Sequence, residues 1–168
     1  MDLTSPPIRT DPLENTVTSR QTRLTEQERR AWQAYVDATT SLQEHLDQQM
    51  QHDARMRSVH YGLLIQLSEA PQQRLRMSEL ARNARISPSR LSHTITRLEN
   101  RGWVRRETCA TDRRGLLAVL TEEGQDVLTR ATSVHSAALR QALFGCLSHD
   151  QQEALLAIMT TVANGLRR

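Results

Sequence analysis

The stretch that decides the fold is MSELARNARISPSRLSHTITRLENRGW, residues 77–103. It contains two sets of apolar residues at helical spacing: Leu80, Ala81 and Ala84, then Leu91, Ile95 and Leu98. Each set predicts one short helix. Ser87 followed by Pro88 is typical of a helix cap and a first helical position, and Gly102 predicts the end of the second helix.

Two short helices joined by a tight turn, with polar and cationic residues on the outside of the second, predict a helix-turn-helix. Ala81 is small enough to let the helices pass closely, and Ile86 is expected to plug the turn. Arg85 stands where many such motifs place glycine, so this residue must tolerate the local backbone. With the apolar side inward, the outer face of the second helix carries Ser89, Arg90, Ser92, His93, Thr96 and Arg97.

This outer face is a candidate DNA contact surface. Arg90 and His93 are candidates for base edges in the major groove, where Arg90 is able to bind guanine O6 and N7 in bidentate fashion. Candidates for phosphate or mixed contacts are Ser87, Ser89, Ser92, Thr96 and Arg97. The alternative for each hydroxyl is an ordinary solvated position, and His93 is equally compatible with a neutral surface residue.

The charge distribution supports nucleic-acid binding. Residues 74–114 carry 11 arginines and four acids, a net charge of +7, whereas the rest of the chain carries 11 arginines and 15 acids, a net charge of −4. Such a block is the electrostatic footprint of a nucleic-acid-binding module, although a solvated basic face is the alternative.

Strands are predicted at WVRRE, residues 103–107, and LLAVL, residues 116–120. The stretch TDRRG, residues 111–115, is the predicted turn between them, so the motif is a winged variant.

Long helices flank this module. TEQE, residues 25–28, predicts a capping box followed by a helix of about 28 residues. Its stripe consists of Trp32, Tyr35, Thr39, Leu42, Leu46 and Met50. A chain of 168 residues cannot bury this stripe alone, so part of it is expected to meet a second subunit.

SVHYGLLIQLSEAP, residues 58–71, predicts a helix that Pro71 stops. TEEG, residues 121–124, predicts a helix that runs to about Phe144, and the last helix begins at Ser148 or His149.

The predicted fold is therefore mainly α with a small β-hairpin wing, a winged helix-turn-helix domain joined to a helical dimerisation region. The expected organisation is a flexible arm, an N-terminal dimerisation helix, the DNA-binding domain and C-terminal dimerisation helices, at residues 1–23, 24–57, 58–120 and 121–168.

The sequence resembles the MarR (multiple antibiotic resistance regulator) family of bacterial transcription factors over about residues 25–166. TDRRGLLAVLTEEG, residues 111–124, resembles the wing pattern of that family, an Asp-x-Arg followed by an apolar strand and Leu-Thr-x-x-Gly. The matching residues are Asp112, Arg114, Val119, Leu120, Thr121 and Gly124. LSHTITRLENRGWVRR, residues 91–106, is similar to the recognition helix and first wing strand of the family.

The resemblance implies a homodimer in which the first helix and the last two helices form the interface. It implies that two winged domains bind half-sites of a palindromic operator, with the wings in the flanking minor grooves. A small-molecule effector between the dimerisation helices and the winged domain would release the DNA, so a repressor is expected. Arg114 would then enter the minor groove, Asp112 would hold its guanidinium, and Arg113 would face phosphates.

Other functions have weaker support in the sequence. There is no glycine-rich phosphate loop, H-E-x-x-H, nucleophile elbow or Cys/His cluster, so an enzyme is not expected, and neither is a cofactor or a metal. No apolar run predicts a membrane span, and no secretory leader is evident, so a cytoplasmic location is expected.

A redox- or metal-responsive regulator of the same fold is the alternative, with Cys109 and Cys146 as thiols and His45 and His52 on one helix face. The groups able to line an effector pocket are Trp32, Tyr35, His60, Tyr61 and His135. Packing at the interface explains Trp32 and Tyr35 equally well, so the effector site is left unassigned.

Overall fold

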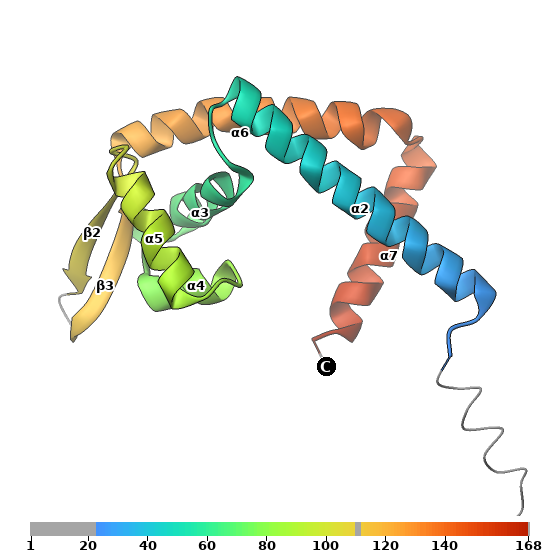
Figure 1. The fold of residues 1–168 in the computed structure, drawn as a ribbon, viewed down its shortest axis with the longest axis horizontal. Helices are drawn as coiled ribbons and strands as arrows, with labels where there is room; N and C mark the ends of the chain where they lie inside the picture. Colours follow the sequence, from blue (N-terminus) through green and yellow to red (C-terminus); the bar gives the residue numbers. More distant parts are fainter. Residues whose placement is uncertain (1–22, 110–111, 168) are drawn as a thin grey trace, which may run out of the picture. The chain divides into compact units, whose positions relative to one another are not determined.

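The computed structural model describes residues 23–109 and 112–167, apart from the side chains of residues 109 and 112–114 (Figure 1). The predicted arm, residues 1–23, lies outside the described residues except for its last position. The described chain is mainly α with one small sheet, as the sequence predicts. It forms two compact units that divide after Ser41, within the first helix.

Helix α2, Glu26–Asp53, begins at the predicted capping box and has the predicted length of 28 residues. The Thr25 N–H donates to Glu28 Oε2 at 2.7 Å, and the Glu28 N–H donates to Thr25 Oγ1 at 3.2 Å. In the first unit, the rings of Trp32 and Tyr35 stack at 5.8 Å, and both side chains are exposed. In the second unit, Met50 near the end of α2 is fully buried.

In addition to a 3-10 turn at Pro71–Gln73, the winged module is built from six elements. These are α3 (Ser58–Glu69), β1 (Arg74–Arg76), α4 (Met77–Asn83), α5 (Pro88–Glu99), β2 (Val104–Cys109) and β3 (Asp112–Leu120). Helices α4 and α5 form the predicted helix-turn-helix, and the β2–β3 hairpin extends beside them (Figure 1). The core is formed by the predicted residues, because Leu80, Ala81, Leu91, Ile95 and Leu98 are all buried. Each of them lies on the inward side of its amphipathic helix.

The sheet differs from the predicted hairpin in two ways. It has three antiparallel strands in the order β1-β3-β2, because Arg74–Arg76 pairs with the edge of β3 that faces away from β2. Pairing also runs further along the hairpin, with Cys109 opposite Asp112 and an irregular register after Thr108. The stretch TDRRG is therefore not a turn over its whole length, since residues 112–115 belong to β3.

The wing joins the next helix through the Thr-x-x-Gly motif. Thr121 caps α6 (Glu122–Ala142), and its Oγ1 accepts from the Gly124 N–H at 3.0 Å. The same hydroxyl donates to the Gly102 carbonyl at 2.6 Å, and the Thr121 N–H donates to the Trp103 carbonyl at 3.1 Å. A Cβ on Gly124 would lie 2.1 Å from that Trp103 oxygen, so only glycine allows this approach.

The C-terminal helices leave much apolar surface exposed. Helix α6 ends at Ala142, slightly before the predicted Phe144, and a 3-10 turn, Phe144–Cys146, follows. Helix α7, His149–Gly165, begins at a capping box formed by Ser148 and contains no buried residue. Large apolar side chains exposed on it include Leu156, Ile158, Met159 and Val162. None of the helices in the described ranges is long and apolar enough to cross a membrane.

Candidate nucleic-acid interface

The turn between α4 and α5 has the backbone that the sequence requires. Arg85 adopts φ of 53°, the left-handed conformation that favours glycine, and Ile86 packs against the core as predicted. A non-glycine residue in this region costs about 1–2 kcal/mol. Ser87 caps α5, because its Oγ accepts from the Arg90 N–H at 3.3 Å, and Pro88 occupies the first helical position.

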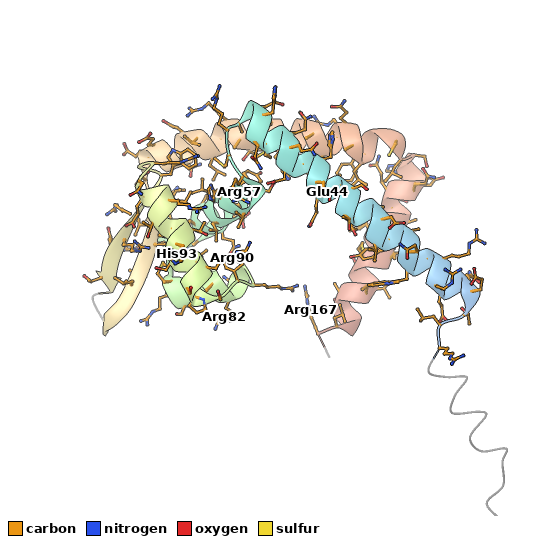
Figure 2. The ribbon with its side chains drawn as sticks, in the orientation of Figure 1. Glu44, Arg57, Arg82, Arg90, His93 and Arg167 are labelled. Carbon is orange, nitrogen blue, oxygen red and sulfur yellow. The ribbon has the colours of Figure 1, made fainter. Side chains whose placement is uncertain are left out.

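The outer surface of α5 is polar and cationic along its length. All seven predicted contact residues of this region are exposed: Ser87, Ser89, Arg90, Ser92, His93, Thr96 and Arg97. Arg90, His93 and Arg97 follow the spacing i, i+3, i+7 and therefore share one face. Figure 2 shows Arg90 and His93 on this helix, with Arg82 on α4 nearby. No ion pair engages Arg90 or Arg97 within the described ranges, so both guanidiniums are available to a ligand.

The sequence did not predict a contact between α5 and the wing. Arg106 of β2 forms an ion pair with Glu99 of α5 and donates to the Ser92 carbonyl at 2.9 Å and to Thr96 Oγ1 at 3.0 Å. Thr96 Oγ1 also donates to the Ser92 carbonyl at 3.0 Å. The Thr96 hydroxyl is therefore engaged inside the protein as well as exposed. The alternation of β2 was the available signal, because it places Arg106 on the opposite face of the strand from Arg105.

The predicted wing-tip contacts remain predictions. The backbone of Asp112, Arg113 and Arg114 lies in β3, but their side chains are outside the described residues. The proposed pairing of Asp112 with Arg114 is therefore neither confirmed nor contradicted.

A second group of arginines surrounds the C-terminal end of α5. His60 of α3 is 5% exposed, and its burial, followed by the charges of Arg101, Arg57 and Arg97, lowers its pKa to about 4. Arg101 donates to the Arg55 carbonyl at 3.2 Å, and its guanidinium lies 4.7 Å from the centre of the Trp103 ring. The positive charges of these arginines therefore disfavour protonation of the buried His60.

A cavity of about 380 Å³ lies in the second unit and is a candidate effector site. Its lining residues are Gln43, Leu46, Asp47, Ser58 and His135. The Ser58 N–H donates to Asp47 Oδ1 at 2.9 Å, which holds the pKa of Asp47 below its ordinary value. The His135 ring stacks on Tyr61 at 4.7 Å, and burial lowers the pKa of His135. Trp32 and Tyr35 belong to the first unit and are not among the residues that line this cavity.

The residues of the redox and metal alternatives are dispersed. Cys146 is an exposed free thiol whose Sγ donates to the Leu143 carbonyl at 3.0 Å, whereas the Cys109 side chain lies outside the described residues. His52 contacts its neighbour Asp53, and no hydrogen bond engages Nε2 of His45 among the described residues. In that part of the chain, no three His, Cys, Asp or Glu residues gather as metal ligands.

Comparison with known proteins places these features among transcriptional regulators rather than enzymes. Residues 56–115 match the model of the MarR family. Sco3205 from Streptomyces coelicolor, a MarR family transcriptional regulator solved in complex with DNA, is 51% identical, with 87% of this chain and 91% of that chain covered and a TM-score of 0.79. AbsC, a MarR family transcriptional regulator from the same organism, is 37% identical over 86% of this chain and 97% of that chain, with a TM-score of 0.78.

A shorter similarity links the chain to the transcriptional regulator HosA of Escherichia coli O127:H6. The two are 35% identical over 74 residues, which cover 44% of this chain and 54% of HosA. The chain thus matches about half the length of this curated relative.

Proposed function

We propose that this chain, which belongs to the MarR family of transcriptional regulators, is a homodimeric repressor that binds a palindromic DNA operator and releases it when a small molecule binds. The observation that carries this proposal is the outer face of α5, where six polar or cationic residues are exposed and the opposite face is buried. The solved relative Sco3205, 51% identical, is itself in complex with DNA. This arrangement fits the major groove, which admits an α-helix and offers base edges to it.

Within this proposal, Arg90 and His93 contact base edges, and Ser87, Ser89, Ser92, Thr96 and Arg97 contact phosphates or mixed positions. Arg113 and Arg114 contact the flanking backbone and minor groove, with Asp112 orienting Arg114. Residues 58–120 are assigned to DNA binding, and residues 24–57 and 121–168 to dimerisation. The protein would act in the cytoplasm, where its operator is accessible.

Fluorescence anisotropy on a palindromic duplex, selected from a random library with the purified protein, tests the DNA contacts. Arg90→Ala should lose about 1–3 kcal/mol of binding free energy and relax the preference at one base pair. Arg114→Ala should weaken binding with less change in base preference. Arg140→Ala, which removes the same charge from α6, is the control and should bind like the wild type. If Arg90→Ala and Arg140→Ala bind alike, the assignment of α5 is wrong.

The dimer is supported by apolar surface that one chain leaves exposed. The Trp32 side chain is 59% exposed and that of Leu156 is 69% exposed, and α7 has no buried residue. Exposed apolar side chains gathered on one helix, as on α7, mark interaction sites. Sedimentation velocity at micromolar concentration should give a dimer, and Leu156→Glu should shift it toward monomer and reduce operator affinity. A wild-type monomer under these conditions would contradict the proposal.

Effector release is supported by the cavity that Asp47, Ser58 and His135 line. A fragment library screened for displacement of a fluorescent operator tests this part of the proposal. Leu46→Trp, which fills the cavity, should keep operator binding but lose the response to the active fragments. Fragments that still release DNA from Leu46→Trp would place the effector site elsewhere.

A further inference from the structure

We propose that Arg106 is a positioning residue that fixes the wing against the recognition helix, so that both elements meet DNA as one rigid unit. This inference rests on the proposed DNA binding, because it explains how two separate contact elements keep one spacing. It adds to the surface residues of α5 a pair of residues, Arg106 and Glu99, that act through the geometry of the interface.

The contacts of Arg106 span two turns of α5. Its backbone N–H donates to Glu99 Oε1 at 3.0 Å, and its guanidinium pairs with Glu99 Oε2. The second terminal nitrogen donates to the Ser92 carbonyl at 2.9 Å and to Thr96 Oγ1 at 3.0 Å. These three partners follow the spacing i, i+4, i+7 and lie on one side of the helix. One strand residue therefore holds a whole side of α5.

The surroundings make this contact stronger than an ordinary surface ion pair. The side chains of Arg106 and Glu99 are only 24% and 26% exposed. Partial burial weakens solvent screening, and a guanidinium with several fixed acceptors loses less freedom for each bond it forms. The carboxylate of Glu99 is held at both oxygens by one residue, so the pair has a defined geometry.

The position of Arg106 along the hairpin gives the contact its mechanical effect. Arg106 pairs with Ala118, two residues beyond the Val104–Leu120 pair at the base of the hairpin. Beyond it the wing continues through Cys109, about 10 Å further at the rise of an extended strand. Without the contact, the hairpin would be free to pivot about its base. A small rotation there displaces the wing tip from the phosphates that it is proposed to meet.

The neighbouring residue offers a matched control. Arg105 lies on the other face of β2 and forms an ion pair with Glu107 on its own strand. Arg105→Met and Arg106→Met remove the same charge from adjacent positions, but only Arg106→Met removes the guanidinium contacts of β2 with α5. The backbone bond from residue 106 to Glu99 is the same in both variants. Arg106→Lys retains the charge and removes the planar fork, so it separates geometry from electrostatics.

The first test is hydrogen exchange of the free protein, which does not depend on DNA. Arg106→Met should speed exchange of the β2 and β3 amides beyond the hairpin base at least about tenfold, with α5 and α6 protected as in the wild type. Arg105→Met should leave the exchange of these amides as it is. Unchanged exchange in Arg106→Met would overturn the proposal, whether or not the protein binds DNA. Faster exchange throughout α5 would also overturn it, because Arg106 would then maintain the fold rather than the wing position.

The second test is a double-mutant cycle on the selected operator. Arg114→Ala should weaken wild-type binding roughly tenfold but should weaken Arg106→Met by less than about twofold, since the displaced wing no longer contributes. Arg106→Lys should behave like Arg106→Met, and in Arg105→Met the full effect of Arg114→Ala should persist. Independent, multiplying effects of Arg106→Met and Arg114→Ala would overturn the proposal. Failure of the wild type to bind any duplex would instead contradict the proposed function and leave the exchange result to decide the role of Arg106.

Discussion

Replacing Gly124 by alanine tests the junction between the wing and α6, because two effects of opposite sign compete there. Alanine in place of glycine favours a helix by about 1 kcal/mol. Against this, the new Cβ would lie 2.1 Å from the Trp103 carbonyl oxygen and 2.8 Å from Leu120 Cδ1. The first contact is with backbone, which cannot move aside by changing a rotamer. We expect the steric effect to dominate.

The magnitude follows from the bonds that relief of this contact would break. The start of α6 must move away from Trp103 by at least about 1.3 Å for the new Cβ to reach ordinary van der Waals contact. That movement breaks the Thr121 N–H bond to the Trp103 carbonyl and the Thr121 hydroxyl bond to the Gly102 carbonyl, now 3.1 and 2.6 Å. Two hydrogen bonds at about 1 kcal/mol each, with residual strain, outweigh the gain in helix propensity. The expected net loss is about 2 kcal/mol of unfolding free energy.

Urea unfolding followed by circular dichroism, at one fixed protein concentration, measures this loss. The corresponding decrease in Tm is roughly 4–8 °C. Gly62→Ala in α3 is the control, because no atom lies within 4 Å of its new Cβ. That variant should gain up to about 1 kcal/mol from helix propensity alone. If Gly124→Ala is as stable as the wild type or gains stability like Gly62→Ala, the close approach to Trp103 does not require glycine.

Three further predictions follow from local features. The pKa of His60 is about 4 in the folded chain and near 6.5 in the unfolded chain, so its contribution to stability is complete above pH 6.5 and declines as the pH falls toward 4. Wild type should therefore lose about 2 kcal/mol more than His60→Gln between pH 7 and 4.5 in urea titrations, and parallel losses would contradict this. Arg85→Gly should gain a few tenths of a kcal/mol by relieving the left-handed backbone, whereas Arg82→Gly, inside α4, should lose about 1 kcal/mol in the same assay. Ser148→Ala should lose about 1 kcal/mol by removing the cap of α7, which a decrease in Tm with unchanged secondary structure would reveal.

Local signals predicted the helices well because their physical causes are local. Capping residues and apolar spacing gave the start of α2, the cap and first residue of α5, and the start of α7. The buried core of the helix-turn-helix followed from the same periodicity. The first strand was missed because Arg74–Arg76 has three residues and no period, and only its pairing with β3 makes it a strand. The hairpin was predicted too short because Asp-Arg-Arg-Gly has a composition typical of turns. Pairing with β2 extends the strand into this stretch.

The candidate site was predictable where a helix face defines it and unpredictable where two elements meet. Exposure of Arg90, His93 and Arg97 follows from the burial of the opposite face of α5. The contact between Arg106 and Glu99 depends on how β2 lies against α5, and no spacing in one chain specifies that. For the same reason, the sequence did not predict the cavity near His135, because residues of three different helices, α2, α3 and α6, line it.

Ion pairs within the basic segment decide which of its charges lie free on the proposed DNA surface. Two of its four acids are already paired, since Glu99 binds Arg106 and Glu107 binds Arg105 and Arg74. These pairs remove carboxylates and arginines together and leave the outer face of α5 with positive charges alone. Counterion release depends on cations that reach phosphates, with a slope of about one per phosphate. Neutralising Arg97 should therefore lower the salt slope of operator binding by about one, whereas Arg105→Met should leave it nearly unchanged. A slope that fell equally in both variants would mean that overall charge, rather than the exposed face of α5, governs binding.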